Sequence, residues 1–390
     1  MTIGFSEQHE LSKQKFKFFV SEHIVPFAND WDNNETFPRE AVAKIAKEGI
    51  LGAIIPKQFG GQEMDPITFG ILCEEFGKGS ISLISLLTVH GMVSQSILKW
   101  GTDQQKEKFL PKLASGEILS AFALSEPNVG SDPKSVETVA TQDSNGDFIL
   151  NGRKKWISCG QIADLYLVVA QVDTKPTAFL LDRKTLGLDV KPITGLYGFR
   201  SAMLAELIFD NCKVKSSDML GRVGFGFSHV ANAALDHGRY CVGWGCVGLG
   251  QACLDASLSY TSKRKQFGAY LRKHQLIQKM IADMATNVRA ARALCLQAGN
   301  LKQMGEPDLI METSIAKYFA SKMALNAAND AVQIHGANGC GSEYPVQRYL
   351  RDAKITEIIE GSSQIQQIII SQSAYHRFLF ESRNARKEKG

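Results

Sequence analysis

One carboxylate in the sequence stands among residues that could make it an effective base. Glu360 follows Ile358 and Ile359 and precedes Gly361. Apolar surroundings disfavour the charged form of a carboxyl group and raise its pKa toward neutrality, where it can accept a proton from a weak acid. The glycine would let the backbone approach a ligand closely. A surface glutamate in an ordinary turn has the same local sequence, so these residues alone leave both interpretations open.

Two further groups of polar residues have both a chemical and a structural interpretation. Ser131 and Asp132 end a loop that contains proline and glycine, where they could bind a ligand or cap a turn. Asp236 and Arg239 are three residues apart in a predicted helix, which suits either a ligand contact or a surface salt bridge. Neither group decides a function by itself.

The sequence excludes several kinds of chemistry. Its eight cysteines form no CxxC motif and none stands with a zinc-type histidine pair, so we expect reduced thiols and no metal site. The 44 basic and 40 acidic residues leave a formal net charge of +4, which is too balanced to indicate nucleic-acid binding. The N-terminus has no apolar run, and no stretch of about 18 uncharged apolar residues occurs. We therefore expect no membrane span and a cytoplasmic protein.

More than one folding unit must position these residues. The 390 residues suggest two or three domains at roughly 100–200 residues each. Residues 1–119 predict an N-terminal helical domain because apolar residues recur every three to four positions. Its helices include about 70–79 and 85–99, and a short last helix ends at Gly116. Sheet and then helix follow, so the chain is predicted to be an α+β multi-domain protein.

Residues 120–225 predict a middle β domain of six or seven strands, as a small barrel or a sandwich. Asn145-Gly146 separates two runs of β-type residues and predicts a hairpin. Asn151-Gly152 predicts another turn. The later runs DLYLVVAQV, TAFLLD and AELIFD predict buried or half-buried strands.

Residues 226–390 predict a C-terminal helical domain. The absence of proline from 193 to 306 leaves room for two long helices, at about 227–262 and 273–303. Two more are predicted at about 311–335 and 362–382. Glycines inside a helix lower its stability, so those in the first of these helices predict a close helix contact. They are Gly243, Gly245, Gly248 and Gly250.

Five segments together resemble the acyl-CoA dehydrogenase family. ALSEPNVGSDPKS at 123–135 and QIHGANGCGSEYPVQRYLRDAK at 333–354 resemble its two signature stretches. KWIS at 155–158 resembles its flavin-edge strand, YTSKRKQFG at 260–268 a flavin-contacting segment, and IIEGSSQIQ at 358–366 its catalytic loop. The segments occur in the family's order and spacing, and the resemblance spans about residues 5–380.

The resemblance implies a fold and a reaction. The fold would be an N-terminal helical domain, a middle β domain and a C-terminal four-helix bundle, with FAD bound partly across the interface of a homotetramer or homodimer. The reaction would remove the α proton and the β hydride of an acyl thioester, with the hydride passing to flavin N5. The electrons would then pass to an electron-transfer flavoprotein or another acceptor. Glu360 matches the general base, and Gly238 occupies the position that carries the base in some members.

The resemblance also implies FAD contacts from several parts of the chain. The loop 122–131 would cradle the flavin ring, and the Arg264 fork would meet the pyrophosphate. The residues that match FAD contacts are Phe122, Leu124, Ser125, Gly130, Ser131, Trp156, Ile157, Ser158, Arg264, Gln266, Phe267, His274, Gln275, Gln333, Gly336, Ala337, Ser362 and Gln364. Ser131, Asp236, Arg239 and Gly361 match contacts to the thioester substrate. Trp156 could also be a core aromatic, and Arg264 a solvated helix charge.

Departures from the family pattern concern the acyl pocket. Ile359 stands where the family's fatty acyl members often have a tyrosine. His90, His237 and Tyr240 match positions in the wall of the family's acyl pocket. Such polar groups are costly beside a long alkyl chain, so we expect a short or branched acyl-CoA substrate. One alternative is an acyl or hydroxyacyl group on an acyl carrier protein in natural-product biosynthesis. Another is a non-catalytic binding member of the family. The structural alternative is that His90, His237 and Tyr240 point into the packing between helices and do not contact the acyl group.

Overall fold

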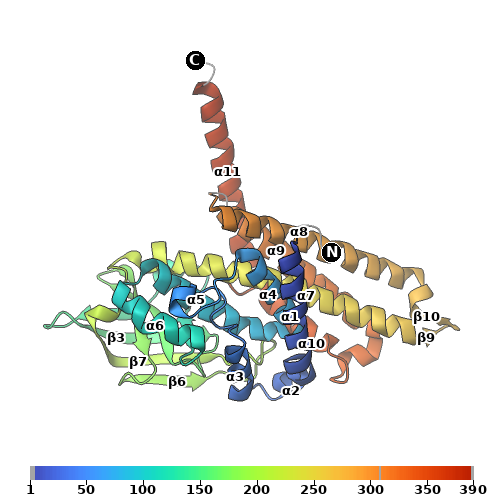
Figure 1. Cartoon of the computed structure of the whole chain (residues 1–390), viewed down its shortest axis with the longest axis horizontal. Coiled ribbons are helices and arrows are strands. Elements are labelled where there is room, and N and C mark those ends of the chain that lie inside the picture. Colours follow the sequence, from blue (N-terminus) through green and yellow to red (C-terminus); the bar gives the residue numbers. More distant parts are fainter. Residues whose placement is uncertain (1–4, 307–308, 388–390) are drawn as a thin grey trace.

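The computed structural model describes residues 5–306 and 309–387. Helices form both ends of the chain and a sheet lies between them (Figure 1). The first part consists of α1 (Glu7–His23), α2 (Ala28–Asn33), α3 (Arg39–Lys47), α4 (Pro66–Ser80), α5 (Ile84–Trp100) and α6 (Asp103–Ser115). Asp65 caps α4 by accepting hydrogen bonds from the amides of Ile67 and Thr68. The predicted end of the last helix at Gly116 is confirmed, because this glycine has the left-handed conformation, with φ +74°.

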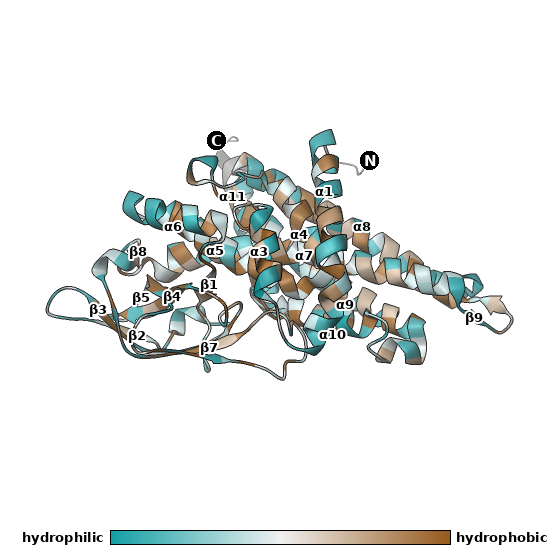
Figure 2. Cartoon of the chain, turned by 60° about the horizontal axis from the view of Figure 1, so that its bottom comes forward, coloured by the Kyte–Doolittle hydropathy of each residue, from teal (hydrophilic) through white to brown (hydrophobic). Residues whose placement is uncertain are grey.

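The two central helices of this part are almost completely buried. Within the described residues, the stretch Pro66–Trp100 is long and apolar enough, by composition alone, to cross a membrane. Of its most apolar window, 89% is buried inside the fold. This is the pattern of core helices. Figure 2 shows apolar residues concentrated on α4, α5 and the helix α7 (Asn232–Lys263) that packs on both.

The middle part forms one mixed sheet of eight strands within the described residues. They are β1 (Ser120–Ala123), β2 (Val139–Gln142), β3 (Phe148–Ile157), β4 (Leu165–Val172), β5 (Lys175–Asp182), β6 (Leu188–Pro192), β7 (Ala205–Val214) and β8 (Met219–Leu220). The order is β6-β7-β3-β2-β4-β5-β8, and β1 pairs in parallel with β4. The predicted hairpin at Asn145-Gly146 is confirmed by the antiparallel pairing of β2 with β3.

The predicted turn at Asn151-Gly152 is wrong. Both residues lie inside β3, where the pairing with β7 shifts register between Leu150 and Gly152. Gly152 has φ +144° and lies so close to the backbone of Thr138 that a Cβ atom would overlap it. The glycine therefore marks a β-bulge and a close strand contact rather than a chain reversal.

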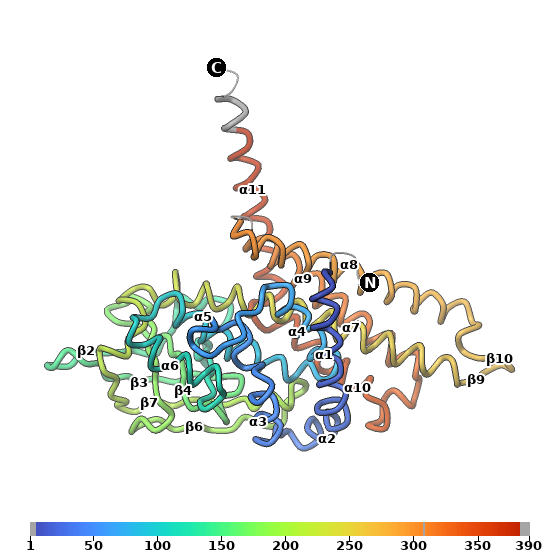
Figure 3. Tube along the Cα trace, in the orientation of Figure 1, coloured from blue at the N-terminus to red at the C-terminus, as the bar shows by residue number. Residues whose placement is uncertain are grey.

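The C-terminal part begins with a π-helical turn, Gly226–Ala231, that continues into α7. After α7 come a small hairpin of β9 (Lys265–Gln266) and β10 (Ala269–Tyr270), and then α8 (Gln275–Met304), α9 (Leu309–His335), α10 (Val346–Thr356) and α11 (Ser363–Lys387). The four predicted helices are present, with bounds shifted by a few residues. The sequence reasoning missed α10. Figure 3 shows α11 projecting away from the rest of the molecule.

The glycines of α7 permit the predicted close helix contact. A Cβ atom on Gly248 would overlap the carbonyl oxygen of Glu74 in α4, and one on Gly77 of α4 would overlap the carbonyl oxygen of Gly245. The backbones of α4 and α7 therefore touch directly. This contact fixes α7, which carries the residues opposite Glu360.

Candidate active site

Glu360 lies in the short loop between α10 and α11, and its carboxylate faces α7. The residue as a whole is partly exposed, but its Oε2 atom is inaccessible and has no hydrogen-bond partner. A Cβ atom on Gly238 of α7 would overlap this oxygen. The backbone does form a turn here, since Glu360 and Gly361 have φ +55° and +86°. The carboxylate of Glu360, however, is not on the surface as it would be in an ordinary exposed turn.

Burial raises the pKa of Glu360 to about 7. The positive charges of Arg239, Lys317 and His237 act in the opposite direction, and the Cys241 thiol adds to the increase. None of these cations forms an ion pair with the Glu360 carboxylate within the described residues. The group is therefore able to gain or lose a proton near neutral pH.

Asp236 and Arg239 do not form the salt bridge that their spacing allowed. Asp236 pairs instead with Lys302 of α8, with 2.5 Å between Oδ2 and Nζ. Arg239 is only 8% exposed, and its Nε donates a hydrogen bond of 3.3 Å to the carbonyl oxygen of Glu360. Arg239 thus lies at the predicted base, and Asp236 lies one turn before it on α7.

The loop after β1 is tied to β3 by a buried ion pair. Lys154 of β3 is fully buried, and its Nζ lies 2.7 Å from Oε1 of Glu126 and 3.0 Å from the carbonyl oxygen of Leu124. Glu126 also accepts hydrogen bonds from the amides of Glu137 and Thr138. Each charge is therefore paired with the other and makes further hydrogen bonds to the backbone.

Two of the predicted flavin segments lie side by side. The amide of Lys155 donates to the carbonyl oxygen of Ser125, at 2.9 Å, so the end of β3 runs beside the loop 122–131. Phe122, Leu124 and Ile157 are buried, Ser125 and Ser158 are half-buried, and Gly130 and Ser131 are exposed.

Trp156 is not a core aromatic. The pairing of β3 with β7 shifts register between Lys154 and Ile157, and Trp156 inside this irregularity has φ +66°. A positive φ is unfavourable for a bulky residue and is retained where the surroundings impose it. The bulge lies at the end of β3, where the Trp156 side chain is 51% exposed, one residue after the Lys155 amide that bonds to Ser125.

The other predicted FAD residues lie at the far end of α7. Arg264, Gln266 and Phe267 are exposed in and before the β9–β10 hairpin, and Phe267 is 97% exposed. His274 is half-buried and its Nε2 lies 3.2 Å from the carbonyl oxygen of Gln266. Gln275, Gln333, Gly336 and Ala337 are exposed. Figures 1 and 2 show this hairpin at the opposite end of the molecule from β3.

Two predicted FAD residues near the base have local structural roles or none. Ser362 Oγ accepts a hydrogen bond of 3.4 Å from the amide of Ile365 in the first turn of α11. Gln364 is exposed. Sequence reasoning missed Lys317 and Gln366, which are fully buried and donate hydrogen bonds to the loop of Glu360. The signal for Lys317 was a lysine on the apolar face of a predicted helix, in SIAKYFA.

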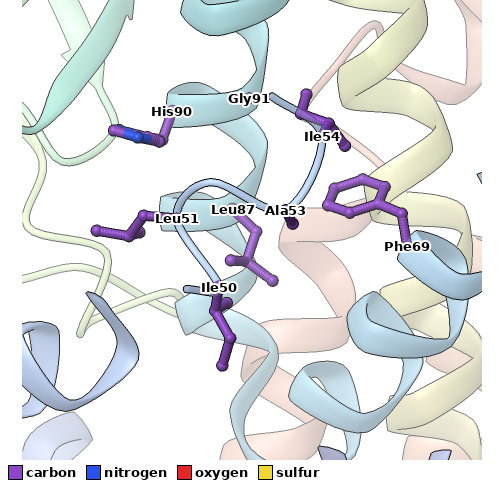
Figure 4. A pocket seen from close by; sticks show the side chains of 8 residues that line it. All are labelled: Ile50, Leu51, Ala53, Ile54, Phe69, Leu87, His90 and Gly91. Carbon is purple, nitrogen blue, oxygen red and sulfur yellow. The ribbon is translucent and has the colours of Figure 1, made fainter. Parts of the chain in front are cut away.

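A small apolar pocket adjoins this region. It is lined from the loop 50–54, α4 and α5 by Ile50, Leu51, Ala53, Ile54, Phe69, Leu87, His90 and Gly91 (Figure 4). The Phe69 ring stacks on His237, with 5.2 Å between ring centroids. A Cβ atom on Gly91 would overlap the ring of His237. The imidazole therefore fills the space between the pocket and Gly238.

Two of the three polar wall residues have partners in helix packing. The Tyr240 hydroxyl donates to the carbonyl oxygen of Pro66 at 2.6 Å. His90 Nε2 lies 3.0 Å from the carbonyl oxygen of Leu113, and the Ser120 amide donates to Nδ1 at 3.3 Å. Burial lowers the pKa of His90 to about 4 and keeps it neutral. Of the three residues, only His237 is left to bind a polar acyl group. Its Nε2 lies 3.4 Å from Cys241 Sγ.

Comparisons with known proteins agree with this fold. The N-terminal, middle and C-terminal domain models of acyl-CoA dehydrogenase match residues 6–117, 121–212 and 224–375. Acryloyl-CoA reductase (NADH) of Anaerotignum propionicum is 38% identical over 97% of each chain. Butyryl-CoA dehydrogenase from Megasphaera elsdenii is 33% identical, with a TM-score of 0.92 over 96% of this chain and 100% of that one. The prolyl acyl carrier protein oxidase AnaB is 30% identical, with a TM-score of 0.90 over 95% and 99%.

The fold is that of a flavin-dependent oxidoreductase that acts on CH–CH bonds. The chain belongs to the acyl-CoA dehydrogenase family. Its cofactor is FAD, and the residues present fit a flavin. Trp156 offers an exposed aromatic face beside Ser125 and Ser158, and the surface at Gly336 is open, with no atom within 4 Å of a Cβ position.

Proposed function

We propose that the chain is an acyl-thioester dehydrogenase in which Glu360 removes the α proton of the substrate. The observation that carries this proposal is the buried, unpaired Oε2 atom of Glu360. A polar atom in such a position is costly unless a ligand uses it. The pKa of about 7 suits a base that must take up a proton at neutral pH and release it again.

The residues around Glu360 define its part in the reaction. Gly238 leaves room for the carboxylate, and the packing of the loop against α7 excludes water from Oε2. Bound FAD supplies the acceptor for the β hydride. Gly361 continues the loop with φ +86°, and Ser131 is exposed, which leaves both residues free for the proposed substrate contacts.

The proposed substrate is a short or branched acyl-CoA. The Phe69–His237 stack narrows the space beside the base, and a buried polar imidazole is unfavourable next to a long alkyl chain. Acryloyl-CoA and butyryl-CoA, the substrates named for two similar proteins, are short. An acyl group on an acyl carrier protein is the second candidate, favoured by the similarity to the prolyl acyl carrier protein oxidase. The retained Glu360 argues against a non-catalytic binding protein.

Anaerobic bleaching of the bound flavin by a panel of acyl thioesters tests this proposal. We expect butyryl-CoA or isobutyryl-CoA to bleach the flavin at least about tenfold faster than palmitoyl-CoA, because a polar group such as the His237 imidazole costs roughly 1–3 kcal/mol beside an alkyl chain that offers it no partner. The same short acyl groups on an acyl carrier protein, with and without a 2- or 3-hydroxyl, separate the two candidates. Fast bleaching by palmitoyl-CoA alone would overturn the short-chain proposal.

We also propose that FAD is shared between two copies of the chain. Gly238, beside the base, and Arg264 are separated along α7 by about 39 Å at a rise of about 1.5 Å per residue. One FAD molecule is too short to touch both ends of the same α7. The exposed Phe267 and the exposed Tyr375, Phe378 and Phe380 of α11 provide apolar surface for a second copy.

The proposed function also includes a cytoplasmic location. The proposed electron acceptor is an electron-transfer flavoprotein or a similar protein.

Arg264→Ala is expected to weaken FAD binding by about ten- to a hundredfold, because a charge-assisted hydrogen bond to phosphate contributes about 1.5–3 kcal/mol. Titration of the apoprotein with FAD, together with light scattering after gel filtration, measures both affinity and oligomeric state. Lys263→Ala is the matched control, since Lys263 is the exposed neighbour in the last turn of α7. Equal FAD affinity in the two variants would make Arg264 a solvated helix charge only.

A further inference from the structure

Three helices hold the two carbonyl groups of the loop that carries the proposed base. Nζ of Lys317, in α9, donates to the Gly361 carbonyl oxygen at 2.9 Å. Nε2 of Gln366, in α11, donates to the carbonyl oxygens of both Glu360 and Gly361 at 3.0 Å. Arg239 of α7 donates to the Glu360 carbonyl oxygen. Each donor is at most 8% exposed, and Lys317 and Gln366 are fully buried.

The held conformation is one that the chain would not adopt without support. Glu360 has φ +55°, which is unfavourable for a residue with a side chain. The donors bind the backbone only, so that they fix the loop while Oε2 of Glu360 keeps no hydrogen-bond partner. This division of contacts is what a base requires, because a carboxylate that is already hydrogen-bonded or ion-paired is a weaker proton acceptor.

The charge of Lys317 is not explained by packing. Its ammonium group is inaccessible to solvent and forms no ion pair within 4.0 Å in the described part of the chain. A buried, unpaired ammonium group is costly, and a methionine would fill a similar volume. Burial lowers the pKa of Lys317 to about 8, so the group is mainly protonated at pH 7.

Glu360 and Lys317 act on each other among a small set of neighbours. The groups that influence Glu360 electrostatically are Arg239, His237 and Cys241 of α7 and Lys317 of α9. Cys246 of α7 and Glu357, in the loop before Glu360, also influence Lys317. Glu357 forms an ion pair with Lys354, with 2.8 Å between Oε2 and Nζ. Lys317 therefore contributes positive charge to the base from α9 without forming an ion pair of its own among the described residues.

We infer that Lys317 and Gln366 are positioning residues for Glu360: Gln366 fixes the left-handed loop, and Lys317 both fixes it and stabilises the ionised carboxylate. The inference rests on the proposed role of Glu360 as the base. It assigns different consequences to the two side chains. Loss of Gln366 should slow the reaction at every pH, whereas loss of the Lys317 charge should move the pH range in which the reaction occurs.

The experiment compares the FAD-loaded wild type with Lys317→Met, Lys317→Gln and Gln366→Leu. Lys317→Gln removes the charge but retains a hydrogen-bond donor, and it serves where Lys317→Met fails to fold. The rate of flavin bleaching by butyryl-CoA is measured from pH 5.5 to 9. Lys322→Met is the control, because Lys322 is an exposed lysine of the same helix that lies over the Tyr318 ring.

We expect the acid limb of the wild-type profile near pH 7, since the base must be ionised to accept a proton. Removing a nearby positive charge raises the pKa of a carboxyl group by roughly one unit or more. Lys317→Gln should therefore be at least about tenfold slower than wild type at pH 6 and within about threefold at pH 9. Lys317→Met should show the same shift of the limb and, because it also loses the hydrogen bond to the Gly361 carbonyl oxygen, a lower rate at both ends of the range. Gln366→Leu should lower the rate at both ends of the range without moving the limb. Unchanged limbs in both Lys317 variants would overturn the inference.

A second readout separates this inference from the proposed reaction. The protonated carboxyl group of Glu360 has an infrared carbonyl band that is identified by its loss in Glu360→Gln. Its titration in the substrate-free protein should move to higher pH in Lys317→Gln and remain in place in Lys322→Met. If that shift occurs while no acyl thioester bleaches the flavin, the positioning role holds and the proposed substrate class is wrong. If the band titrates identically in all three proteins, the positioning role is wrong.

Discussion

Glu360→Gln should retain FAD and bind the thioester substrate, yet lose about 10²–10⁴-fold in the rate of flavin reduction. The amide is nearly the same shape as the carboxylate but cannot accept the α proton, and positioned general bases contribute rate factors of this size. Rapid-mixing absorbance of the bound flavin under anaerobic conditions measures the rate. Spectral perturbation on adding a thioester that cannot be oxidised measures binding.

Glu357→Gln is the matched control for this variant. Glu357 precedes the base by one helical turn and pairs with Lys354 at 2.8 Å, so its loss should leave the rate within a few fold of wild type. Near-normal flavin reduction by Glu360→Gln would place the base elsewhere. Asp236 is then the next carboxylate on this face of α7, although it pairs with Lys302.

Lys154→Met should lower the free energy of unfolding by about 3–5 kcal/mol, because it leaves the buried Glu126 carboxylate without its counter-ion. The same change removes the hydrogen bond from Lys154 to the Leu124 carbonyl oxygen and loosens the loop 122–131. We therefore expect weaker FAD binding as well. Denaturant unfolding of the apoprotein and FAD titration measure the two effects separately.

The double variant Glu126→Gln with Lys154→Met tests the cause of this loss. Removing both charges avoids an unpaired buried carboxylate, so the double variant should be more stable than Lys154→Met alone. Lys191→Met, at an exposed lysine of β6, should change the unfolding free energy by less than about 1 kcal/mol. A single variant as stable as this control would show that the ion pair does not anchor the loop.

Short-range patterns predicted the order of the fold well. Helical periodicity located α4 and α5, the proline-free stretch located α7 and α8, and α9 and α11 were also predicted. The Asn145-Gly146 hairpin was recognised from two residues that favour such turns. The same dipeptide logic failed at Asn151-Gly152. There the glycine serves a bulge against Thr138, a contact between strands that local sequence does not contain.

The candidate site was predictable only where one segment carries the chemistry. Glu360 and Gly361 are adjacent in sequence, and the family resemblance located them together. The lysine on the apolar face of the predicted helix marked Lys317 as unusual, but the partners of Lys317 and Gln366 were found only when α9 and α11 were placed around the loop, because a hydrogen bond to a backbone carbonyl leaves no residue pattern. The environments of His90 and Tyr240 were likewise undetermined, since their partners are the carbonyl groups of Leu113 and Pro66.

The contact between Gly238 and Glu360 restricts how this family can exchange one catalytic carboxylate for another. A side chain at 238 and the carboxylate at 360 compete for the same space, so a chain can carry its base at one position or the other. Any side chain at position 238 would displace the Glu360 carboxylate, which is the proposed base. With Glu360 in that role, moving the carboxylate to position 238 of this chain requires changes at both positions together.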